Sequence, residues 1–374
     1  MVCGAKPAKL RKLGSEVMKT NQYVTLGRSG LCVSPLCLGT MTFGTEWGWG
    51  ADDATSAALF DRYLAAGGNF VDTADFYTEG KSEEILGELI RDRKVRDRVV
   101  LATKFTFNPE PGNPNAGGNG RKNVYRALEG SLKRLGTDYI DLYWLHAWDT
   151  ITPIEEVLAT FDDLTKSGKI RYYGFSNVPA WYASRAQTIA EREGKARPIA
   201  LQLEYSLVER NIEREHVPCA QELGIGICPW SPLASGFLSG KYSCSNQAPS
   251  TEGRLNVLKD SGNPAFEKFT ERNWRIVDVL LEVAKELNRT PAEVALNWVA
   301  TQPGVSSTII GATKMSQLEK NLAAIELEIP NQLRLRLKKI SEIDQVHPYV
   351  FFGSFFQNWI KGGVEIRPWV RHTQ

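Results

Sequence analysis

The sequence predicts an α/β protein built as a closed (β/α)8 barrel. Eight short runs rich in β-branched and aromatic residues alternate with amphipathic runs of helical length. The strand-like runs are almost continuously apolar, which is typical of parallel strands that are covered by helices. No Gly-x-Gly-x-x-Gly sequence joins the first run to a helix, so a doubly wound sheet is the less favoured alternative.

The expected elements follow in chain order. Strands are expected at residues 33–40, 69–74, 99–105, 140–146, 170–176, 199–204, 226–229 and 307–310. Two of the intervening helices carry a start signal, because Thr152 with Glu155 and Thr290 with Glu293 have the spacing of a capping box. A proline directly after each threonine favours the same helix starts.

The barrel domain is expected over residues 22–345. Within it, residues 22–35 have the pattern of a β-hairpin, which we expect to turn at residues 28–30 and to close the floor of the barrel. The long loop at residues 107–121 is rich in Asn and Gly and is a candidate lid. The leader before the barrel, residues 1–21, is expected to be disordered.

The last segment, residues 346–374, is an aromatic tail. Because burial of one aromatic side chain contributes roughly 1.5–3 kcal/mol, we expect this tail to pack on the barrel. It could cover the outer helices or reach the C-terminal mouth and form one wall of a pocket there. The aromatic residues at its start are Tyr349, Phe351, Phe352, Phe355, Phe356 and Trp359.

Composition narrows the classes of partner. The net charge of +2 gives no reason to expect nucleic acid or a membrane surface as partner. No apolar run approaches the ~18 residues of a transmembrane helix, and no secretory signal is visible. Six cysteines without a CxxC pair and four scattered histidines predict free thiols in a reducing cytoplasm and no metal site.

Four side chains with complementary proton chemistry lie near the ends of consecutive expected strands. Asp72 is in the second strand, while Lys104 and His146 are near the ends of the third and fourth. Tyr77 lies in the loop after the second strand, so a parallel barrel brings all four to one mouth. A phenol has a pKa of about 10, which a neighbouring ammonium lowers by favouring the phenolate. Each residue alone is compatible with a structural role, but together they predict a site that protonates a developing alkoxide.

These motifs resemble the aldo-keto reductase superfamily. Asp-Thr-Ala at residues 72–74, followed by Tyr77, has the order and spacing of that family's first motif. A strand ending in Lys104 and then Asp-Leu-Tyr-x-x-His at residues 141–146 complete the tetrad. The likeness covers residues 22–345, is nearest to bacterial reductases similar to potassium-channel β-subunits, and implies a TIM barrel. Further matching motifs are residues 174–177, Gln202, residues 230–233 and residues 310–313.

The resemblance implies that NADP(H) is the cofactor. By its motifs, Ser176, Asn177 and Gln202 would bind the nicotinamide carboxamide, Trp230 would stack on the ring, and Lys314 would bind the 2′-phosphate. Many relatives carry Glu where Lys320 stands, next to Asn321, so the resemblance does not extend to the adenine contact at that position. The full set of implied cofactor positions is Gly39, Thr40, Met41, Ser176, Asn177, Gln202, Trp230, Ser231, Pro232, Leu233, Gly236, Leu238, Lys241, Arg254, Gly311, Thr313, Lys314, Gln317 and Asn321.

The implied activity is the reversible, NADPH-dependent reduction of an aldehyde or ketone to the alcohol. Tyr77 would give the proton, Lys104 paired with Asp72 would activate it, and His146 would position the carbonyl. The alternative is an NADP-binding regulatory or channel-associated subunit with little turnover, in which the position of His146 usually differs. A member that oxidises a sugar or secondary alcohol would use the same residues.

Three tryptophans indicate where a small-molecule substrate would bind. Trp47 and Trp49 follow the first expected strand, and Trp148 follows the fourth. Residues at these places should lie around the mouth of the barrel. We therefore expect an aromatic-walled pocket, which suits aryl aldehydes, quinones, sugars or a larger ketone.

Overall fold

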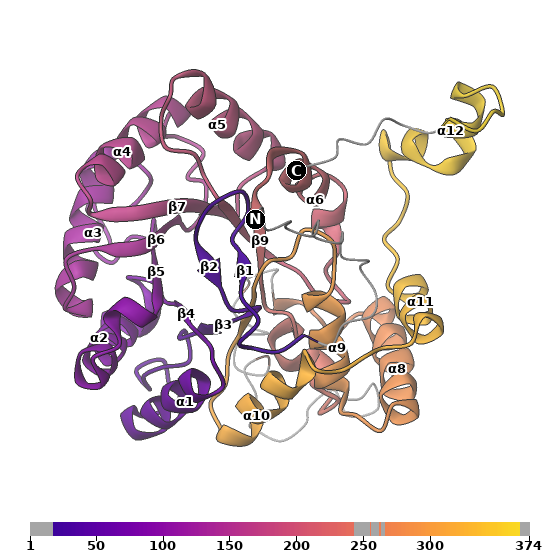
Figure 1. Ribbon diagram of the computed structural model, residues 1–374, viewed down its shortest axis with the longest axis horizontal. Helices are drawn as coiled ribbons and strands as arrows, with labels where there is room; N and C mark the ends of the chain where they lie inside the picture. The colour runs from indigo at the N-terminus through magenta and orange to yellow at the C-terminus, as the bar shows by residue number, and fades with distance from the viewer. Residues whose placement is uncertain (1–17, 243–254, 256–261, 263–265, 367–374) are drawn as a thin grey trace, which may run out of the picture.

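Eight parallel strands form the centre of the molecule (Figure 1). The computed structural model describes residues 18–242, 255, 262 and 266–366. Seven of the strands pair in chain order, from β3 to β9, and β10 pairs with β3. The strands are β3 (Leu36–Gly39), β4 (Phe70–Asp72), β5 (Val100–Phe105), β6 (Ile140–Leu145), β7 (Ile170–Ser176), β8 (Ala200–Glu204), β9 (Gly226–Trp230) and β10 (Thr308–Ile310).

The sheet closes on itself just before β10. Ile227 of β9 forms a parallel bridge with Val305. The Ile227 amide donates to the Gly304 carbonyl at 3.0 Å, and the Ser306 amide donates to the Ile227 carbonyl at 2.9 Å. The expected (β/α)8 barrel is therefore confirmed. The first expected strand, 33–40, is divided between two sheets, because Val33 belongs to β2 of a separate two-stranded sheet and the barrel strand β3 begins at Leu36.

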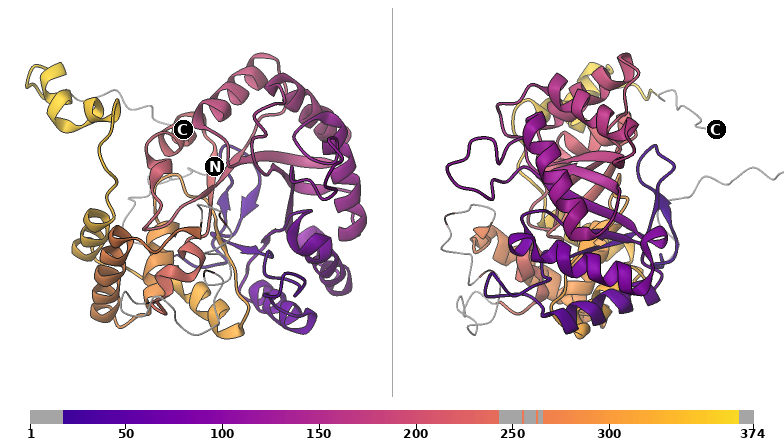
Figure 2. Two further views of the ribbon diagram at one scale, coloured as in Figure 1. Left: turned by 180° about the vertical axis from the view of Figure 1, so that it is seen from behind. Right: turned by 90° about the vertical axis from the view of Figure 1, so that its left-hand side faces the viewer.

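Helices surround the barrel on its outside (Figures 1 and 2). Thr290 and Glu293 form the expected capping box of α9. The box expected from Thr152 and Glu155 does not form, because α4 begins at Ile154 with Pro153 at its N-cap, and the Thr152 hydroxyl donates to Asp149 at 2.6 Å. Within the described residues, no helix combines the length and apolarity needed to cross a membrane. The helices are α1 (Asp53–Ala65), α2 (Lys81–Arg93), α3 (Arg121–Leu135), α4 (Ile154–Lys166), α5 (Ala180–Arg192), α6 (His216–Leu223), α8 (Glu271–Glu286), α9 (Pro291–Ala300), α10 (Met315–Ala324), α11 (Asn331–Ile340) and α12 (Ser354–Ile360), and the short 3-10 helices are η1 (Tyr77–Gly80), η2 (Arg96–Arg98), η3 (Asn211–Glu213), η4 (Ala234–Ser239) and η6 (Tyr349–Phe352).

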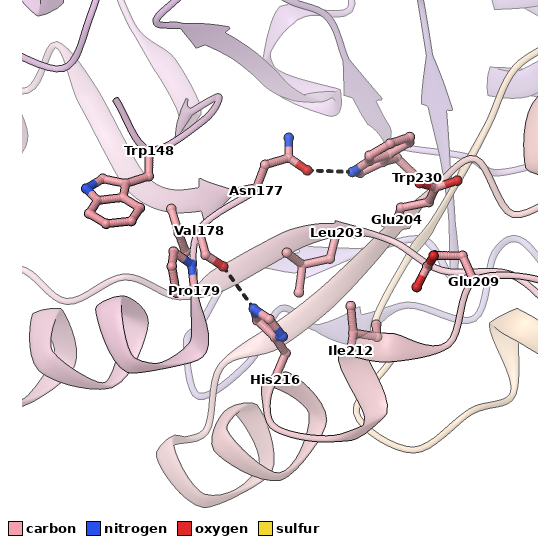
Figure 3. Close-up of a pocket in the computed structure, with 10 residues that line it drawn as sticks. All are labelled: Trp148, Asn177, Val178, Pro179, Leu203, Glu204, Glu209, Ile212, His216 and Trp230. Carbon is pink, nitrogen blue, oxygen red and sulfur yellow. Dashed lines mark hydrogen bonds between the residues drawn. The ribbon is translucent and has the colours of Figure 1, made fainter. Parts of the chain in front are cut away.

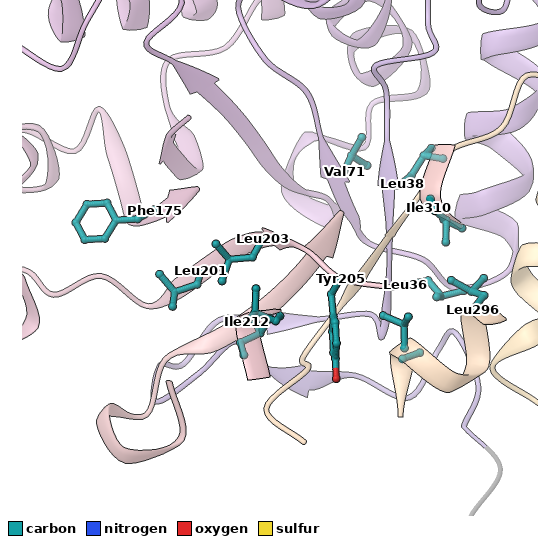
Figure 4. Close-up of a cluster of buried hydrophobic side chains, with 14 of the residues drawn as sticks. Leu36, Leu38, Val71, Phe175, Leu201, Leu203, Tyr205, Ile212, Leu296 and Ile310 are labelled. Atoms are coloured by element: carbon teal, nitrogen blue, oxygen red, sulfur yellow. The ribbon is translucent and has the colours of Figure 1, made fainter. Parts of the chain in front are cut away.

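Alternate residues of each strand belong to two separate apolar layers. The outer layer, between strands and helices, includes Leu36, Leu38 and Val71 (Figure 4). The inner layer fills the barrel and includes Phe70 and Ala102 on neighbouring strands. Since side chains of a strand alternate between its faces, a residue two positions beyond an inner-layer residue also points into the barrel.

A two-stranded hairpin closes the floor of the barrel. Its strands, β1 (Val24–Thr25) and β2 (Cys32–Val33), are antiparallel. Leu26 and Val33 are fully buried and belong to the inner apolar layer. Gly27 has a φ of +58°, and a Cβ there would lie 2.4 Å from the Ile199 carbonyl, so only glycine fits this close approach. The structure thus contains the expected hairpin.

The two ends of the chain differ from what the sequence predicted. Residues 1–17 of the leader lie outside the described residues, but its last part is ordered, because Thr20 is buried and Met18 packs on the core. No residue of η6 or α12 in the tail is buried, and α12 lies apart from the barrel helices (Figure 1). Phe355 and Trp359 are 63% and 68% exposed.

The described part of the tail, residues 346–366, therefore differs from the packed tail that its composition predicted. Its rings pack on one another, as Phe351 and Phe356 do with centroids 4.4 Å apart. One polar contact of this segment with the barrel is made by the Tyr349 hydroxyl, which donates to Glu215 at 2.6 Å. A high aromatic content predicts that side chains pack against an apolar surface, but it does not identify that surface.

A buried polar cluster lies behind the loop that follows β4. Glu83 is fully buried and accepts from the Thr103 hydroxyl at 2.5 Å and from Arg134 at 2.7 Å. The amide of Asp75 donates to the Lys104 carbonyl at 3.1 Å. One carboxyl oxygen of Asp75 is buried and has no hydrogen-bond partner among the described residues. Burial and the Glu83 carboxylate raise the pKa of Asp75 to about 7.

The raised pKa of Asp75 predicts a specific pH dependence of stability. The folded protein holds the Asp75 proton up to about pH 7, whereas the unfolded chain releases it near its usual value of about 3.9. Asp75 therefore stabilises the fold at low pH, and this contribution is lost as the pH rises through 7. We would measure the free energy of unfolding in urea between about pH 5 and 8. The value for Asp75→Asn minus the value for wild type should increase with pH, because only wild type loses the contribution of Asp75. The exposed Asp97→Asn is the control, and parallel curves for Asp75→Asn and wild type would contradict the assignment.

Candidate active site

The four candidate catalytic residues meet at the C-terminal end of the barrel. Asp72 ends β4, Lys104 lies within β5, and His146 directly follows β6. The Lys104 ammonium is fully buried and donates to the Asp72 carboxylate. It also donates to the Thr73 carbonyl at 2.8 Å and to the Tyr77 hydroxyl at 3.1 Å. An ammonium has three N–H donors, and these three acceptors use all of them.

The charge on Lys104 is maintained by its partners. Burial favours the neutral amine, but the Asp72 carboxylate and Tyr77 outweigh it, so the pKa of Lys104 lies above its ordinary value. The second Asp72 oxygen accepts from the Gln202 side chain at 3.1 Å. A permanently charged ammonium is thus held in an apolar interior, directly beside a phenol.

A tight turn returns the Tyr77 side chain over Lys104. In η1, Thr78 and Glu79 have φ values of +46° and +58°, a conformation that L-residues rarely adopt. The Thr78 hydroxyl donates to the Phe43 carbonyl at 2.9 Å and accepts from the Ser82 amide at 3.0 Å. Backbone strain of this kind costs of order 1–3 kcal/mol per residue, and it persists here because these hydrogen bonds hold the turn.

His146 contributes a neutral imidazole to the site. Burial and the charge of Lys104 hold its pKa well below the ordinary range. Its Nδ1 is buried and has no hydrogen-bond partner in the part of the chain that the structure describes. Its ring lies edge-on to the Tyr77 ring, with centroids 5.9 Å apart. A neutral imidazole has one donor and one acceptor nitrogen, so it can donate a hydrogen bond without bringing a charge.

The residues implied for the nicotinamide end lie on β7, β8 and β9 at the same end of the barrel. Ser176 and Trp230 end β7 and β9, Gln202 lies within β8, and Asn177 directly follows β7. The Asn177 amide donates to the His146 carbonyl at 2.9 Å and to the Ser176 hydroxyl at 2.9 Å. Its oxygen accepts from the Trp230 indole N–H at 3.2 Å. Together with the Gln202–Asp72 bond, these contacts connect the implied cofactor positions directly to the tetrad.

The residues implied for the phosphates lie after β9 and β10. Ser231, Ser235 and Gly236 have positive φ values of 52°, 56° and 90°, which turn the backbone sharply after β9. A Cβ on Gly236 would lie 3.1 Å from Lys241 Nζ, so the missing side chain leaves space beside a lysine. These features fit a phosphate-bearing cofactor.

The start of α10 is also suited to an anion. Lys314 occupies its N-cap, is exposed and makes no side-chain cap, so the first backbone N–H groups are not capped by that side chain. The Thr313 amide and hydroxyl both donate to Gln317, at 2.8 and 3.2 Å. Asn321 donates to the Gly311 carbonyl at 3.2 Å. Arg254, the other implied phosphate ligand, lies outside the described residues.

The other implied cofactor positions differ in their exposure. Thr40, Pro232 and Leu238 are buried, and the Thr40 hydroxyl donates to the Asp72 carbonyl at 3.2 Å. Met41 and Leu233 are half-buried. Gly39 lies in β3, where a Cβ would come within 2.7 Å of an Ile309 methyl group. The buried side chains of this set can shape the site but offer little surface to a ligand.

A cavity of about 490 Å³ adjoins this site (Figure 3). Trp148, Asn177 and Trp230, all expected from the sequence, line it. His216 was not expected there; it lines the same cavity and its Nε2 lies 2.9 Å from the Val178 carbonyl. The charged sequence around His216 gives no signal for a place in this cavity. None of the described tail residues lines this cavity, so it provides no support for the expected pocket wall.

Trp47 and Trp49 lie instead in an aromatic wall beside Tyr77. The Trp47 ring is 5.7 Å from Trp49, 6.0 Å from Phe76 and 6.4 Å from Tyr77. Phe107 extends the wall to the imidazole, since its centroid lies 4.7 Å from that of His146. Phe76 and Phe107 were not singled out from the sequence, although Phe76 directly precedes Tyr77 and Phe107 lies three residues beyond Lys104.

Known proteins are similar in sequence to this chain over most of its length. The sequence model of the Aldo/keto reductase family matches residues 35–342. The uncharacterized oxidoreductase YrpG of Bacillus subtilis is 37% identical over 85% of this chain and 95% of its own. A probable voltage-gated potassium channel subunit beta of Oryza sativa is 37% identical over 87% of this chain and 98% of its own. The aryl-alcohol dehydrogenase [NADP(+)] of Phanerodontia chrysosporium is 32% identical over 87% of each chain. The chain therefore belongs to the aldo/keto reductase family, and its oxidoreductase-named relatives indicate an oxidoreductase that acts on carbonyl groups.

Proposed function

We propose that this protein uses NADPH to reduce an aldehyde or ketone to the alcohol, with Tyr77 as the proton donor. One observation carries the proposal: the Lys104 ammonium lies 3.1 Å from the Tyr77 hydroxyl while Asp72 holds it from the other side. A phenol whose conjugate base faces a fixed ammonium is suited to donate a proton to a developing alkoxide.

The reduction needs a hydride and a proton, and NADPH supplies the hydride to the carbonyl carbon when it is bound. Tyr77 transfers its proton to the carbonyl oxygen. The Lys104 ammonium then stabilises the phenolate that remains, and Asp72 keeps that ammonium in position. In the reverse direction the same phenolate accepts the proton of an alcohol.

His146 would hold the carbonyl oxygen close to Tyr77. A neutral imidazole donates a hydrogen bond to that oxygen more strongly as negative charge develops on it. The low pKa of His146 keeps this role separate from proton donation, because the ring stays neutral across the physiological range. Tyr77 therefore remains the acid of the pair.

NADPH is favoured over NADH by the lysines at the implied phosphate positions. Lys314 stands at the N-cap of α10 and Lys241 beside the turn at Gly236. Backbone N–H groups at a helix start together with a lysine suit an extra phosphate. Trp230 would lie under the nicotinamide ring, where offset stacking contributes about 0.5–1.5 kcal/mol beyond burial. The name of the Phanerodontia relative also specifies NADP(+).

An aryl aldehyde or aryl ketone is the substrate class that the site fits best. The wall formed by Trp47, Phe76 and Phe107 runs beside Tyr77 and His146. Flat aromatic surfaces favour aromatic ligands through stacking and apolar contact. The aryl-alcohol dehydrogenase among the relatives agrees with this choice. We also propose a cytoplasmic location, because the four cysteines of the described residues are free thiols.

A channel-associated subunit with little turnover is the second candidate, because two plant relatives are named as potassium channel β-subunits. The discriminating measurement is steady-state NADPH oxidation with a panel of aryl aldehydes. Ordinary enzymatic turnover supports the reductase, whereas tight NADPH binding with negligible turnover on every aldehyde supports the subunit.

Replacing the proton donor should strongly lower turnover without weakening cofactor binding. Because general acid catalysis contributes ~10²–10⁴-fold, Tyr77→Phe should lower kcat by that factor. NADPH affinity, measured by fluorescence titration, should stay within a few-fold of wild type. Tyr125→Phe, on α3, is the control and should behave as wild type. Near-normal turnover of Tyr77→Phe would mean that another group supplies the proton.

Removing the charge at the start of α10 should affect only the phosphorylated cofactor. A charged hydrogen bond contributes about 1.5–3 kcal/mol, so Lys314→Gln should raise the KM for NADPH roughly tenfold or more. The KM for NADH should change little, since NADH lacks the 2′-phosphate. Lys320→Gln, on the same helix, is the matched control. Equal losses for both cofactors would show that Lys314 does not recognise this phosphate.

A further inference from the structure

A second cavity, of about 300 Å³, lies at the floor of the barrel. The hairpin turn, the start of β7 and the segments that lead into β8 and β9 line it, so it opens at the end away from the tetrad. Figure 2 shows the hairpin at this end of the barrel. Its volume is at the lower limit for small-molecule sites.

The charged residues that line this cavity are all arginines. Arg28, Arg171 and Arg197 contribute to it, and no aspartate or glutamate does so among the described residues. Arg197 pairs with Glu191 at 3.2 Å, and Arg171 donates to the Gly168 carbonyl at 2.8 Å. These two arginines therefore have partners outside the cavity. The charged side chains of the cavity lining are nevertheless all positive.

Arg28 differs from the other two because its side chain has no such partner. The guanidinium makes no hydrogen bond or ion pair with any residue in the described ranges. Its backbone is nevertheless fixed, since its amide donates to the Gly224 carbonyl at 2.6 Å. A Cβ on Gly224 would lie 2.9 Å from the Arg28 Cβ, so the two segments are in close contact. Arg28 is exposed, so its guanidinium is an unpaired donor at the rim of the cavity and is available to an anion.

Gln187 of α5 provides a second, independent observation. Its side chain lines the cavity and is only 6% exposed, yet its Oε1 has no hydrogen-bond partner within the described part of the chain. The neighbouring donors are already used: the Tyr173 hydroxyl donates to the Ala196 carbonyl at 2.7 Å, and the Thr165 hydroxyl donates to the Phe161 carbonyl at 2.8 Å. Buried polar atoms are nearly always paired with protein or water, so Gln187 Oε1 is an acceptor that a water or a ligand in the cavity can satisfy.

We propose that this cavity binds a small organic anion, a carboxylate or a phosphate monoester, that also carries a hydroxyl donor. The anionic group lies against Arg28, with Arg171 and Arg197 adding positive charge. The hydroxyl donates to Gln187 Oε1. Tyr172, Pro198 and Leu223 are lining residues that provide apolar surface for the body of the ligand. This site is separate from the candidate active site and does not depend on the proposed reduction.

The test is isothermal titration calorimetry on the full chain with saturating NADPH. The probes are 4-hydroxybenzoate and 4-hydroxyphenyl phosphate, which carry both groups, benzoate, which lacks the donor, and 4-hydroxybenzyl alcohol, which lacks the charge. We expect the first two to bind more tightly than the last two. The tighter of 4-hydroxybenzoate and 4-hydroxyphenyl phosphate identifies which anion the site prefers.

Variants then locate the binding. Arg28→Gln should weaken 4-hydroxybenzoate roughly tenfold or more, while Arg91→Gln, an exposed arginine on α2, should leave it unchanged. Gln187→Met keeps the size of the side chain and removes its acceptor, so it should abolish the advantage of 4-hydroxybenzoate over benzoate. This comparison between probes remains informative if Arg28→Gln does not fold. Failure of both hydroxylated anions to bind wild type, or equal binding to wild type and Gln187→Met, would overturn the proposal.

Discussion

The buried ion pair of Lys104 and Asp72 is the interaction on which the rest of the site depends. Charges are costly to remove from water, and breaking a buried pair by removing one partner typically costs about 3–5 kcal/mol. Here the pair lies above an apolar interior that includes Phe70 and Ala102. The ammonium must therefore satisfy every N–H locally, and one of its acceptors is the Tyr77 hydroxyl. The same requirement that stabilises the charge thus fixes the distance between lysine and phenol.

Much of this geometry could be predicted from the sequence because strands have a period of two residues. Asp72 and Lys104 lie two positions beyond Phe70 and Ala102, which point into the barrel. His146 likewise lies two positions beyond Trp144, another inner-layer residue. A parallel barrel places these strand ends around one mouth. The strand runs and the spacing of the motifs were therefore sufficient to predict that these three side chains converge.

Other features depend on contacts that the sequence does not encode locally. The aromatic wall needs the turn at Thr78, whose positive φ follows from hydrogen bonds to residues far along the chain or in the next helix. His216 reaches its cavity because η3 and α6 return to the end of β7, which the charged sequence of that region does not indicate. The tail was misjudged for a related reason. Its aromatic residues pack against each other, as Phe355 and Trp359 do with centroids 4.9 Å apart, so composition alone could not place them on the barrel.

The hairpin at the floor has a kinetic consequence. Leu26 and Val33 cover the filled interior from below, so within the described residues the floor gives no route to Lys104. A cofactor and a substrate that both reach Lys104 would then arrive from the C-terminal end of the barrel. If the substrate lies over the cofactor there, the cofactor can leave only after the substrate or product has left. Departure of the cofactor would then limit how fast the site is renewed, whatever the speed of the chemistry.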